Sequence, residues 1–353
     1  MKAERVDIKN ALDARNVRCL KFLDNTPGAC FQHTTEWGKV ITSLGHDEFW
    51  AITVERGQDI VGFMPVYLFT GPRGSILNSI PYPGPLGGVV TAASYERESI
   101  YSLALDKLDQ FAKELGCVAA TIISSPFHPD DELYRLHWNP TAELPNYTLC
   151  IDLTKPQETN SHFRNNLNRM LKKAQSNGFV VDSNTSLGDL TEWYGIHKAR
   201  HEHLGLDPIL FEIFSGALTY MVSADKGKFF YIKNTENKIV VGCFVAYNNQ
   251  VVDTYLYSGD VNAYKNGAMY LLISSILEWA KNKGYKIFNW ESSKPRFGGP
   301  YNFKMQWGSK ELPYYFFTKV YSNTNRFTSV PLEQIKEEYK WHFVLPYSMF
   351  EQK

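Results

Sequence analysis

The sequence lacks an excess of either charge. Lysine and arginine together number 37 among 353 residues, and so do aspartate and glutamate, so the formal net charge is zero. Such a chain has no overall field that attracts nucleic acid or an acidic membrane surface, and any polyanion site has to be local. Long apolar runs are missing too, because no stretch reaches the ~18 residues of a membrane-spanning helix.

Cysteine is scarce and scattered. The five cysteines include no CxxC pair, and their odd number does not allow complete pairing into disulfides. This usage predicts reduced, mostly buried thiols. The opening residues, MKAERVDIKNALDARN, contain no apolar segment of a secretory signal. We therefore expect a soluble, cytoplasmic chain.

A metal motif is also lacking. His197, His201 and His203 read H-x-x-x-H-E-H, so no glutamate lies between the two histidines that are one helical turn apart. We therefore expect no metal site. Arg200 lies in the same cluster and is the better candidate for binding an anionic substrate group.

The most regular pattern lies between Val251 and Gly308. Residues 251–257 alternate β-branched and aromatic side chains, 268–280 repeat apolar residues at helical spacing, and 286–291 form a short strand. A strand, a crossover helix and a second strand make a βαβ-like unit.

An earlier part of the chain repeats this unit. Residues 60–67 align with 240–247, and 103–125 align with 271–293, in the same order. The hairpin glycine (Gly62, Gly242) and the helix-ending glycine (Gly116, Gly284) recur in both copies. We interpret the chain as two copies of one α/β domain, residues 1–150 and 151–353.

Three further segments are assigned from composition. Residues 71–90 contain so many prolines that we expect a loop and no strand there. A basic helix is expected over 155–178, where a site for tRNA and a solvated helix face are the alternatives. The aromatic tail, 325–353, is expected to pack on the second domain.

The repeated hairpin–strand–helix–strand unit, the helix RNNLNRMLKKAQSNG, YLYSG and the terminal FKMQWG together resemble the Fem-type peptidoglycan aminoacyltransferases. They equally resemble the wider group of Fem-like, Gcn5-related N-acyltransferase (GNAT) proteins. The resemblance extends over nearly the whole chain. It implies an α/β (α+β) fold of tandem GNAT-like domains, each a mixed twisted sheet flanked by helices. It also implies transfer of an acyl or aminoacyl group onto a primary amine.

In ligases of this family that act on the cell-wall precursor, residues of this kind hold a UDP-linked muropeptide. By position the matches in this chain are Lys39, Arg200, Tyr255, Tyr257, Phe303 and Lys304. The chain lacks the long helical arm of some Fem ligases, which weakens a tRNA-dependent interpretation. The donor stays open: we expect no tightly bound cofactor, and acyl-CoA or aminoacyl-tRNA as co-substrate.

A Gly-rich basic stretch supplies the first catalytic candidate. Lys304 lies in it together with Lys294 and Arg296, and a flexible loop with three cations suits phosphates or a developing oxyanion. The alternative is a solvated surface loop. On the loop interpretation, Lys304→Ala should reduce turnover far more than stability.

The strand over 251–257 and its neighbour supply the others. Tyr255 and Tyr257 are two residues apart and Asp253 precedes them, so we expect all three on one face. Tyr257 would orient the substrate or protonate a leaving group, unless both tyrosines are core aromatics. Glu291 or Asp253 would take the amine proton, unless each is a cap or an ion-pair partner.

The start of the helix at 268 is the cofactor candidate. Lys265, Asn266, Gly267 and Ala268 would present free backbone N–H groups to a pyrophosphate, and the alternative is a simple turn into the helix.

Together these features predict an N-acyltransferase that works by direct transfer, since no Cys or Ser lies in a nucleophile motif. Its acceptor would be an amine of an anionic or nucleotide-linked molecule, such as a cell-wall or glycan precursor. A tRNA-dependent Fem ligase and a non-catalytic GNAT-like binding module are the alternatives.

Overall fold

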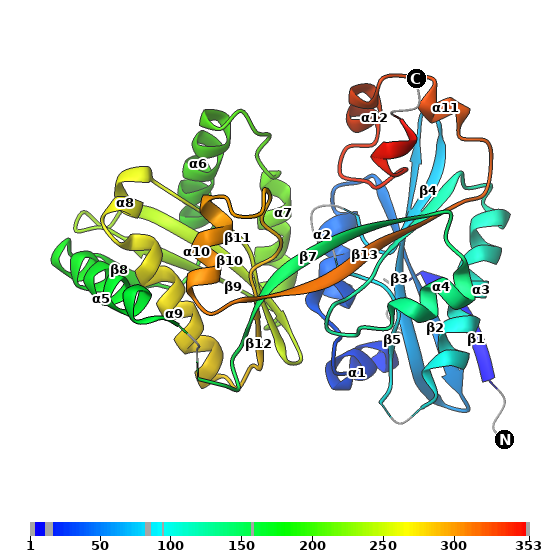
Figure 1. The fold of residues 1–353 in the computed structure, drawn as a ribbon, viewed down its shortest axis with the longest axis horizontal. Helices are drawn as coiled ribbons and strands as arrows, with labels where there is room; N and C mark the ends of the chain where they lie inside the picture. Colours follow the sequence, from blue (N-terminus) through cyan, green and yellow to red (C-terminus); the bar gives the residue numbers. More distant parts are fainter. Residues whose placement is uncertain (1–3, 11–16, 82–85, 94, 157–158, 351–353) are drawn as a thin grey trace. The chain divides into compact units, whose positions relative to one another are not determined.

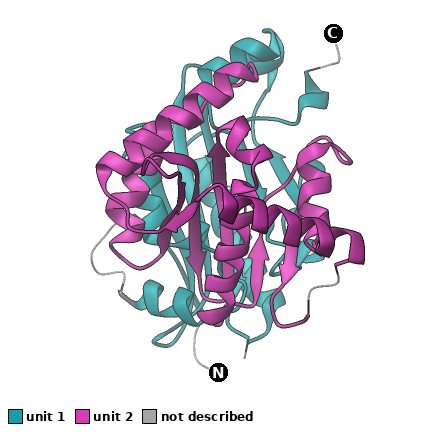
Figure 2. Ribbon diagram, turned by 90° about the vertical axis from the view of Figure 1, so that its left-hand side faces the viewer, with its two compact units in different colours: residues 1–147, 313–353 teal, residues 148–312 magenta. Residues whose placement is uncertain are grey.

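The chain forms two compact units in the computed structural model. The described part is the whole chain apart from residues 1–3, 11–16, 82–85, 94, 157–158 and 351–353 (Figure 1). Unit 1 comprises residues 1–147 and 313–353, and unit 2 comprises residues 148–312 (Figure 2). The chain enters unit 2 within strand β7 (Ala142–Asp152) and leaves it within strand β13 (Lys310–Val320). The expected division at residue 150 falls close to the first crossing, but the last forty or so residues fold with unit 1.

In unit 1 the strands hydrogen-bond in the order β1, β2, β3, β4, β6, β13, and β5 pairs with β3. Only β4 and β6 run parallel among these pairs. The strands are β1 (Glu4–Asn10), β2 (Asp47–Arg56), β3 (Asp59–Gly71), β4 (Gly74–Asn78), β5 (Val90–Thr91) and β6 (Ala119–Ile123). The α-helices are α1 (Val17–Asn25), α2 (Thr35–Thr42), α3 (Arg97–Glu114), α4 (Asp131–Trp138), α11 (Asn325–Thr328) and α12 (Leu332–Glu338), with short 3-10 turns at Phe31–His33 and Tyr347–Met349.

The C-terminal segment belongs to the core of unit 1. Leu77 of β4 packs in the core cluster that contains α3, whereas its neighbour Ile76 packs with Phe327, Ile335 and Tyr339 of the tail. Successive strand residues point to opposite faces, so α3 and the tail cover opposite faces of the sheet. The prediction that residues 325–353 pack on the second domain is therefore wrong.

The expectation of a loop over residues 71–90 is also wrong in part. Residues 74–78 form β4, which pairs with β3 and, in parallel, with β6. The prolines of this stretch lie at 72, 81, 83 and 85, outside the five residues that make the ladder, so they remove no hydrogen bond from it. Residues 82–85 of this stretch lie outside the described residues.

In unit 2 the strand order is β7, β12, β11, β10, β9, β8. The β11–β12 pair is parallel and its neighbours are antiparallel. The strands are β8 (Val180–Asp182), β9 (Gly227–Lys233), β10 (Ile239–Asn248), β11 (Val251–Gly259) and β12 (Ile287–Asn289). The helices are α5 (Ser161–Ser176), α6 (Leu187–His203), α7 (Phe211–Gly216) with a π-helix at Ala217–Val222, α8 (Val261–Lys265), α9 (Ala268–Asn282) and α10 (Gly299–Gln306).

Helices α6 and α9 lie on opposite faces of the unit 2 sheet. Trp193 of α6 contacts the rings of Phe229 and Tyr231, whereas Trp279 of α9 contacts the ring of Phe230. Because Phe230 lies between the other two on β9, its side chain points to the other face.

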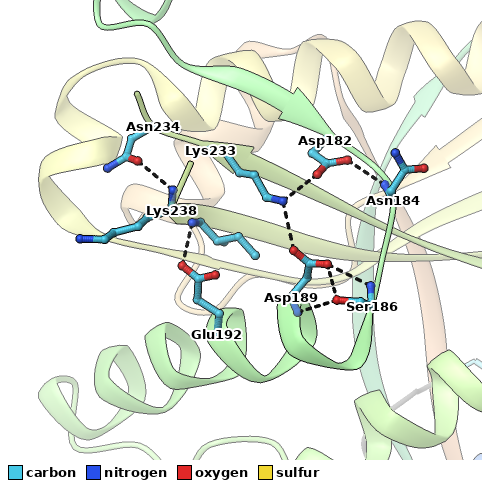
Figure 3. A network of polar contacts seen from close by, with 9 residues as sticks. Asp182, Asn184, Ser186, Asp189, Glu192, Lys233, Asn234 and Lys238 are labelled. Carbon is cyan, nitrogen blue, oxygen red and sulfur yellow. Dashed lines mark hydrogen bonds and ion pairs between the residues drawn. The ribbon is translucent and has the colours of Figure 1, made fainter. Parts of the chain in front are cut away.

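A polar network fixes the start of α6 to the edge of this sheet (Figure 3). Ser186 caps the helix, and its side chain and that of Asp189 bond each other's backbone N–H groups. Lys233 of β9 donates to Asp189 at 3.1 Å and to Asp182 at 2.8 Å. Glu192 accepts from the Ile239 N–H at 2.9 Å. The network therefore joins α6 to β8, β9 and β10.

The internal repeat is confirmed as a repeat of topology. In unit 1 the hairpin β2–β3 is followed by β4, helix α3 and β6, with β4 and β6 parallel. In unit 2 the hairpin β9–β10 is followed by β11, helix α9 and β12, again with the last two strands parallel. Each unit is a mixed sheet flanked by helices, as expected.

A buried histidine makes the stability of unit 2 depend on pH. His197 of α6 is fully buried, its Nε2 accepts from the Ile209 N–H at 3.1 Å, and its Nδ1 lies 3.2 Å from the Ser258 hydroxyl. Burial lowers the pKa of His197 from 6.5 to about 4. The unfolded chain thus binds the extra proton first, and stability is lost as pH falls from about 6.5 to about 4.

Each pKa unit corresponds to about 1.36 kcal/mol, so His197 should make the free energy of unfolding fall by about 3 kcal/mol between pH ~7 and pH ~4. We predict that His197→Gln does not show this part of the fall. Urea unfolding at both pH values measures it. His203→Gln, an exposed position on the same helix, is the matched control. Equal pH dependence in the two variants would contradict the assignment.

Candidate functional site

Strands β11 and β12 separate at a point that we call the fork. Their parallel pairing ends with Asp253 opposite Asn289, although β11 continues to Gly259. Beyond β12 the Trp290 N–H donates to the Leu149 carbonyl of β7 at 2.8 Å, so this segment follows β7 and leaves β11. Side chains from both strands meet at the fork.

A β-bulge in β11 adjoins the fork. Ala246 of β10 pairs with Asp253 and Phe244 pairs with Leu256, so a step of two residues on β10 matches a step of three on β11. Strict alternation is interrupted between Asp253 and Leu256. The period of the strand alone therefore does not place Asp253 on one face with Tyr255 and Tyr257.

Two carboxyl groups lie at the fork, those of Asp253 and Glu291, which we call the acid pair. They are within hydrogen-bond reach of each other. Burial raises the pKa of Asp253 to about 7, and burial together with the Asp253 charge raises the pKa of Glu291 well above its ordinary value. Asp253 Oδ1 and Glu291 Oε2 are buried without another partner among the described residues, an arrangement in which one proton would join the two carboxyls.

Asn289 connects the parts of the fork. Its Nδ2 donates to Asp253 Oδ2 at 2.6 Å. Its Oδ1 accepts from the hydroxyl of Thr148 at 2.5 Å, from the backbone N–H of Glu291 at 3.2 Å and from the thiol of Cys150 at 3.4 Å. The amide is fully buried, so these bonds fix the position of the Asp253 carboxyl.

Lys304 lies on α10 and is only 4% exposed, so the prediction that it belongs to a flexible loop is wrong. Residues 299–306 form a helix because Pro300 occupies its first turn, where no backbone N–H is needed. Lys304 Nζ donates to the carbonyls of Trp290, Glu291 and Ser292 at 2.6, 3.2 and 3.4 Å. An ammonium group has three protons, and all three have acceptors here.

These contacts decide what Lys304 is able to do. Burial lowers its pKa to about 8, opposed by the charges of Glu291 and Asp253, so it stays an ammonium ion at neutral pH. It holds the segment that carries Glu291, whose φ is +63°. Lys304 is thus placed to position the acid pair and to balance its charge.

Tyr257 lies beside this cluster, with Lys304 Nζ 6.0 Å from its ring centre. Burial raises its pKa, so the phenol keeps its proton at neutral pH. Burial also raises the pKa of its neighbour Tyr264, against the effect of the Arg200 guanidinium of α6. Tyr255 is 9% exposed and packs against Phe244.

The other candidates in unit 2 lie farther out. Phe303 is half-buried between Tyr270 and Trp307, at ring distances of 5.4 and 6.0 Å. Arg296 is exposed and forms two bonds to the Glu311 carboxylate, at 3.0 and 2.9 Å. Its guanidinium is therefore already bound to an anion of the chain itself.

The proposed pyrophosphate turn is covered. Gly267 has φ +93° and begins α9, but Gly267 and Ala268 are buried against α5. A Cβ on Gly267 would lie 2.2 Å from the Met170 carbonyl oxygen. Lys173 donates to the Lys265 carbonyl at 2.9 Å, beside Asn266. The observed packing is that of a tight turn into the helix.

Lys39 belongs to unit 1, where it is exposed on α2. Within the described ranges no group of three or more histidine, cysteine or acidic side chains is arranged to hold a metal ion. No described helix is long and apolar enough to cross a membrane.

Of the sequence candidates, the structure brings Tyr257, Glu291 and Lys304 together. Sequence reasoning missed Asn289 and undervalued Asp253. The register of β11 against β12 is the signal that reveals both, because it makes them the last pair before the fork.

No family model and no curated protein matches this sequence. Solved structures do. FemX matches with a TM-score of 0.69 over 89% of this chain and 97% of its own, at 11% identity. The chain has the Fem-like, GNAT-type fold. L-PGS from Bacillus licheniformis matches with a TM-score of 0.60 over 95% of this chain and all of its own, at 15% identity.

A tandem GNAT protein from the clavulanic acid biosynthesis pathway matches with a TM-score of 0.54, at 10% identity. It covers 91% of this chain and all of its own. The three solved structures thus share the fold of this chain over about nine tenths of its length or more, and at 10–15% identity they show the fold alone.

We predict that Lys304→Ala lowers the free energy of unfolding by about 3 kcal/mol, because it leaves three buried carbonyls and the acid pair without their cation. This reverses the expectation from the loop interpretation. Lys294→Ala, at an exposed residue nearby, should change stability by less than about 0.5 kcal/mol. Urea unfolding compares them, and equal stabilities would refute the role assigned to Lys304.

Proposed function

We propose that this protein is an N-acyltransferase. It moves an acyl or aminoacyl group onto a primary amine of an anionic or nucleotide-linked acceptor, such as a cell-wall or glycan precursor. The observation that carries the proposal is the acid pair at the fork, held by Asn289 and Lys304. The likeness to FemX and to a tandem GNAT protein supports the reaction class.

The acid pair suits the proton movements of this reaction. The amine nitrogen attacks the acyl carbon, a C–N bond forms, and the bond to the leaving atom breaks. The amine proton passes to the ionised carboxyl of the pair, and the proton that Glu291 already holds goes to the leaving atom. The pair therefore ends the cycle with one proton, as it began.

Tyr257 and Lys304 complete this assignment. The protonated phenol of Tyr257 is the donor for the oxyanion that develops on the acyl oxygen. Lys304 acts through the position of Glu291 and through its charge, since its own protons are bound to carbonyl oxygens. Arg200 would contact an anionic group of the acceptor.

A second candidate donor is aminoacyl-tRNA. Helix α5 carries four exposed cations, Arg164, Arg169, Lys172 and Lys173. Such a group of cations suits the phosphates of a nucleic acid, and binding through these side chains would weaken steeply with salt. Another similar solved structure is named as the C-terminal domain of a lysylphosphatidylglycerol synthetase, and lysylphosphatidylglycerol carries an aminoacyl group. A solvated helix face remains the alternative use of these side chains.

We expect one donor class to stabilise the protein in a thermal-shift screen with CoA, acetyl-CoA, long-chain acyl-CoA, aminoacyl-tRNA and UDP-N-acetyl sugars. A ligand at ~100 times its dissociation constant adds roughly 2.7 kcal/mol. Turnover is then measured with that donor and amine acceptors. Binding of a donor without turnover on any amine would favour the non-catalytic binding module.

We predict that kcat/KM rises with pH through about 7, because the Asp253 carboxyl has to be ionised. Asp253→Asn keeps the bond from Asn289 but removes the base, so this pH dependence disappears and kcat/KM falls about 10²-fold or more. Glu278→Gln, at an exposed carboxylate on α9, is the control. An unchanged pH profile in Asp253→Asn would rule out the acid pair as the base.

A further inference from the structure

Residues 292–298, which we call the fork loop, connect Glu291 of the acid pair to helix α10. Lys304 of that helix donates to the carbonyls of Glu291 and Ser292, so the helix returns to the point where the loop begins. The chain from Glu291 to Lys304 is therefore an excursion that starts and ends beside the acid pair, with the fork loop inside it.

Hydrogen bonds hold the fork loop on both sides of Phe297. The Gly298 N–H donates to the Pro295 carbonyl at 3.2 Å, which closes a turn around Phe297. Asn302 Nδ2 of α10 donates to the Phe297 carbonyl at 2.8 Å, and the Arg296 guanidinium bonds a carboxylate of β13. The loop is thus fixed to α10 and to β13.

Phe297 itself has an unfavourable conformation and an unfavourable environment. Its φ is +65°, in the left-handed region that bulky side chains rarely occupy. Its ring is 75% exposed and meets the ring of Tyr301 edge to face, with the centres 5.3 Å apart. Neither the strained backbone nor the exposed ring stabilises the fold. Strain of this kind clusters at ligand sites, where a side chain has to be presented in advance.

A cation lies in the same loop. Lys294 is exposed and forms no ion pair with a described residue, unlike Arg296. An aromatic face stacks on a nucleobase of any identity, and a lysine binds phosphate as a point charge. The fork loop therefore combines the two contacts that a nucleotide requires.

We propose that the fork loop binds the nucleotide part of a substrate, with the base against Phe297 and the phosphates near Lys294. The inference rests on the proposed function, in which the acceptor or a CoA donor carries a nucleotide, and it names the residues that hold this part. Both sources share the chemistry of a nucleoside diphosphate. Phe297 acts on affinity and specificity and takes no part in proton transfer.

Isothermal titration calorimetry of the full-length protein with ADP, UDP and pyrophosphate tests the proposal. We expect one nucleoside diphosphate per chain, and Phe297→Asn should weaken its binding about 10-fold, in the range of a lost base stack. Pyrophosphate has no base, so this substitution should not change its binding, whereas Lys294→Gln should weaken the binding of all three. Tighter binding of ADP would assign the site to the donor, and tighter binding of UDP to the acceptor.

The stability of the variants separates a binding role from a packing role. Asparagine tolerates a positive φ better than phenylalanine does, so Phe297→Asn should unfold at the same urea concentration as the parent or at a higher one. Phe297→Trp keeps an aromatic face and should retain nucleotide binding. Tyr220→Asn, at another exposed aromatic residue of unit 2, is the control and should bind as the parent does.

The results distinguish this inference from the proposed function. Absence of nucleotide binding, unchanged binding in Phe297→Asn, or weaker binding that comes only with a less stable fold would overturn the inference. Acyl transfer whose KM for the nucleotide substrate is the same in Phe297→Asn would also overturn it and leave the proposed function intact. Nucleotide binding that depends on Phe297 in a protein without acyl transfer would refute the proposed function alone.

Discussion

Two carboxyl groups buried within hydrogen-bond reach of each other are the constraint that organises unit 2. Two negative charges in a dry interior cost several kcal/mol each, so the pair keeps one proton and needs one cation. Lys304 is that cation, and its charge opposes the rise in the pKa of both carboxyl groups. Helix α10 and the segment after β12 have to lie close together for Lys304 to reach the acid pair.

The same constraint determines how each residue takes part in chemistry. A lysine whose ammonium group had an unbound N–H could donate a hydrogen bond to a substrate oxyanion, but the protons of Lys304 have backbone acceptors. The proposed proton carriers are therefore the Asp253 and Glu291 carboxyls. Asn289 holds both residues, because its Nδ2 donates to the Asp253 carboxyl and its Oδ1 accepts from the Glu291 backbone N–H.

Local patterns in the sequence were enough to predict the repeated architecture but not the fork. Periodicity and glycine placement identify both hairpins and both crossover helices, since these depend on neighbours in the chain. The bulge that separates Asp253 from Tyr257 depends on pairing with β10, which no local pattern contains. The prediction of a loop around Lys304 was wrong for a similar reason. The Gly-rich stretch forms helix α10, and its Lys304 bonds carbonyls of another segment, which the local sequence pattern does not show.

The acid pair belongs to only one copy of the repeat, among the described residues. The parallel pairing in unit 1 ends at Asn78, the counterpart of Asp253, and the counterpart of Glu291 by alignment is Ile123. A neutral amide and an aliphatic side chain hold no shared proton. Asn78 instead exchanges bonds with the Phe343 backbone, at 2.8 and 2.9 Å, so the returning C-terminal segment packs at the end of the parallel pair. The same position in the repeated topology is thus a packing site in unit 1 and carries the acid pair in unit 2.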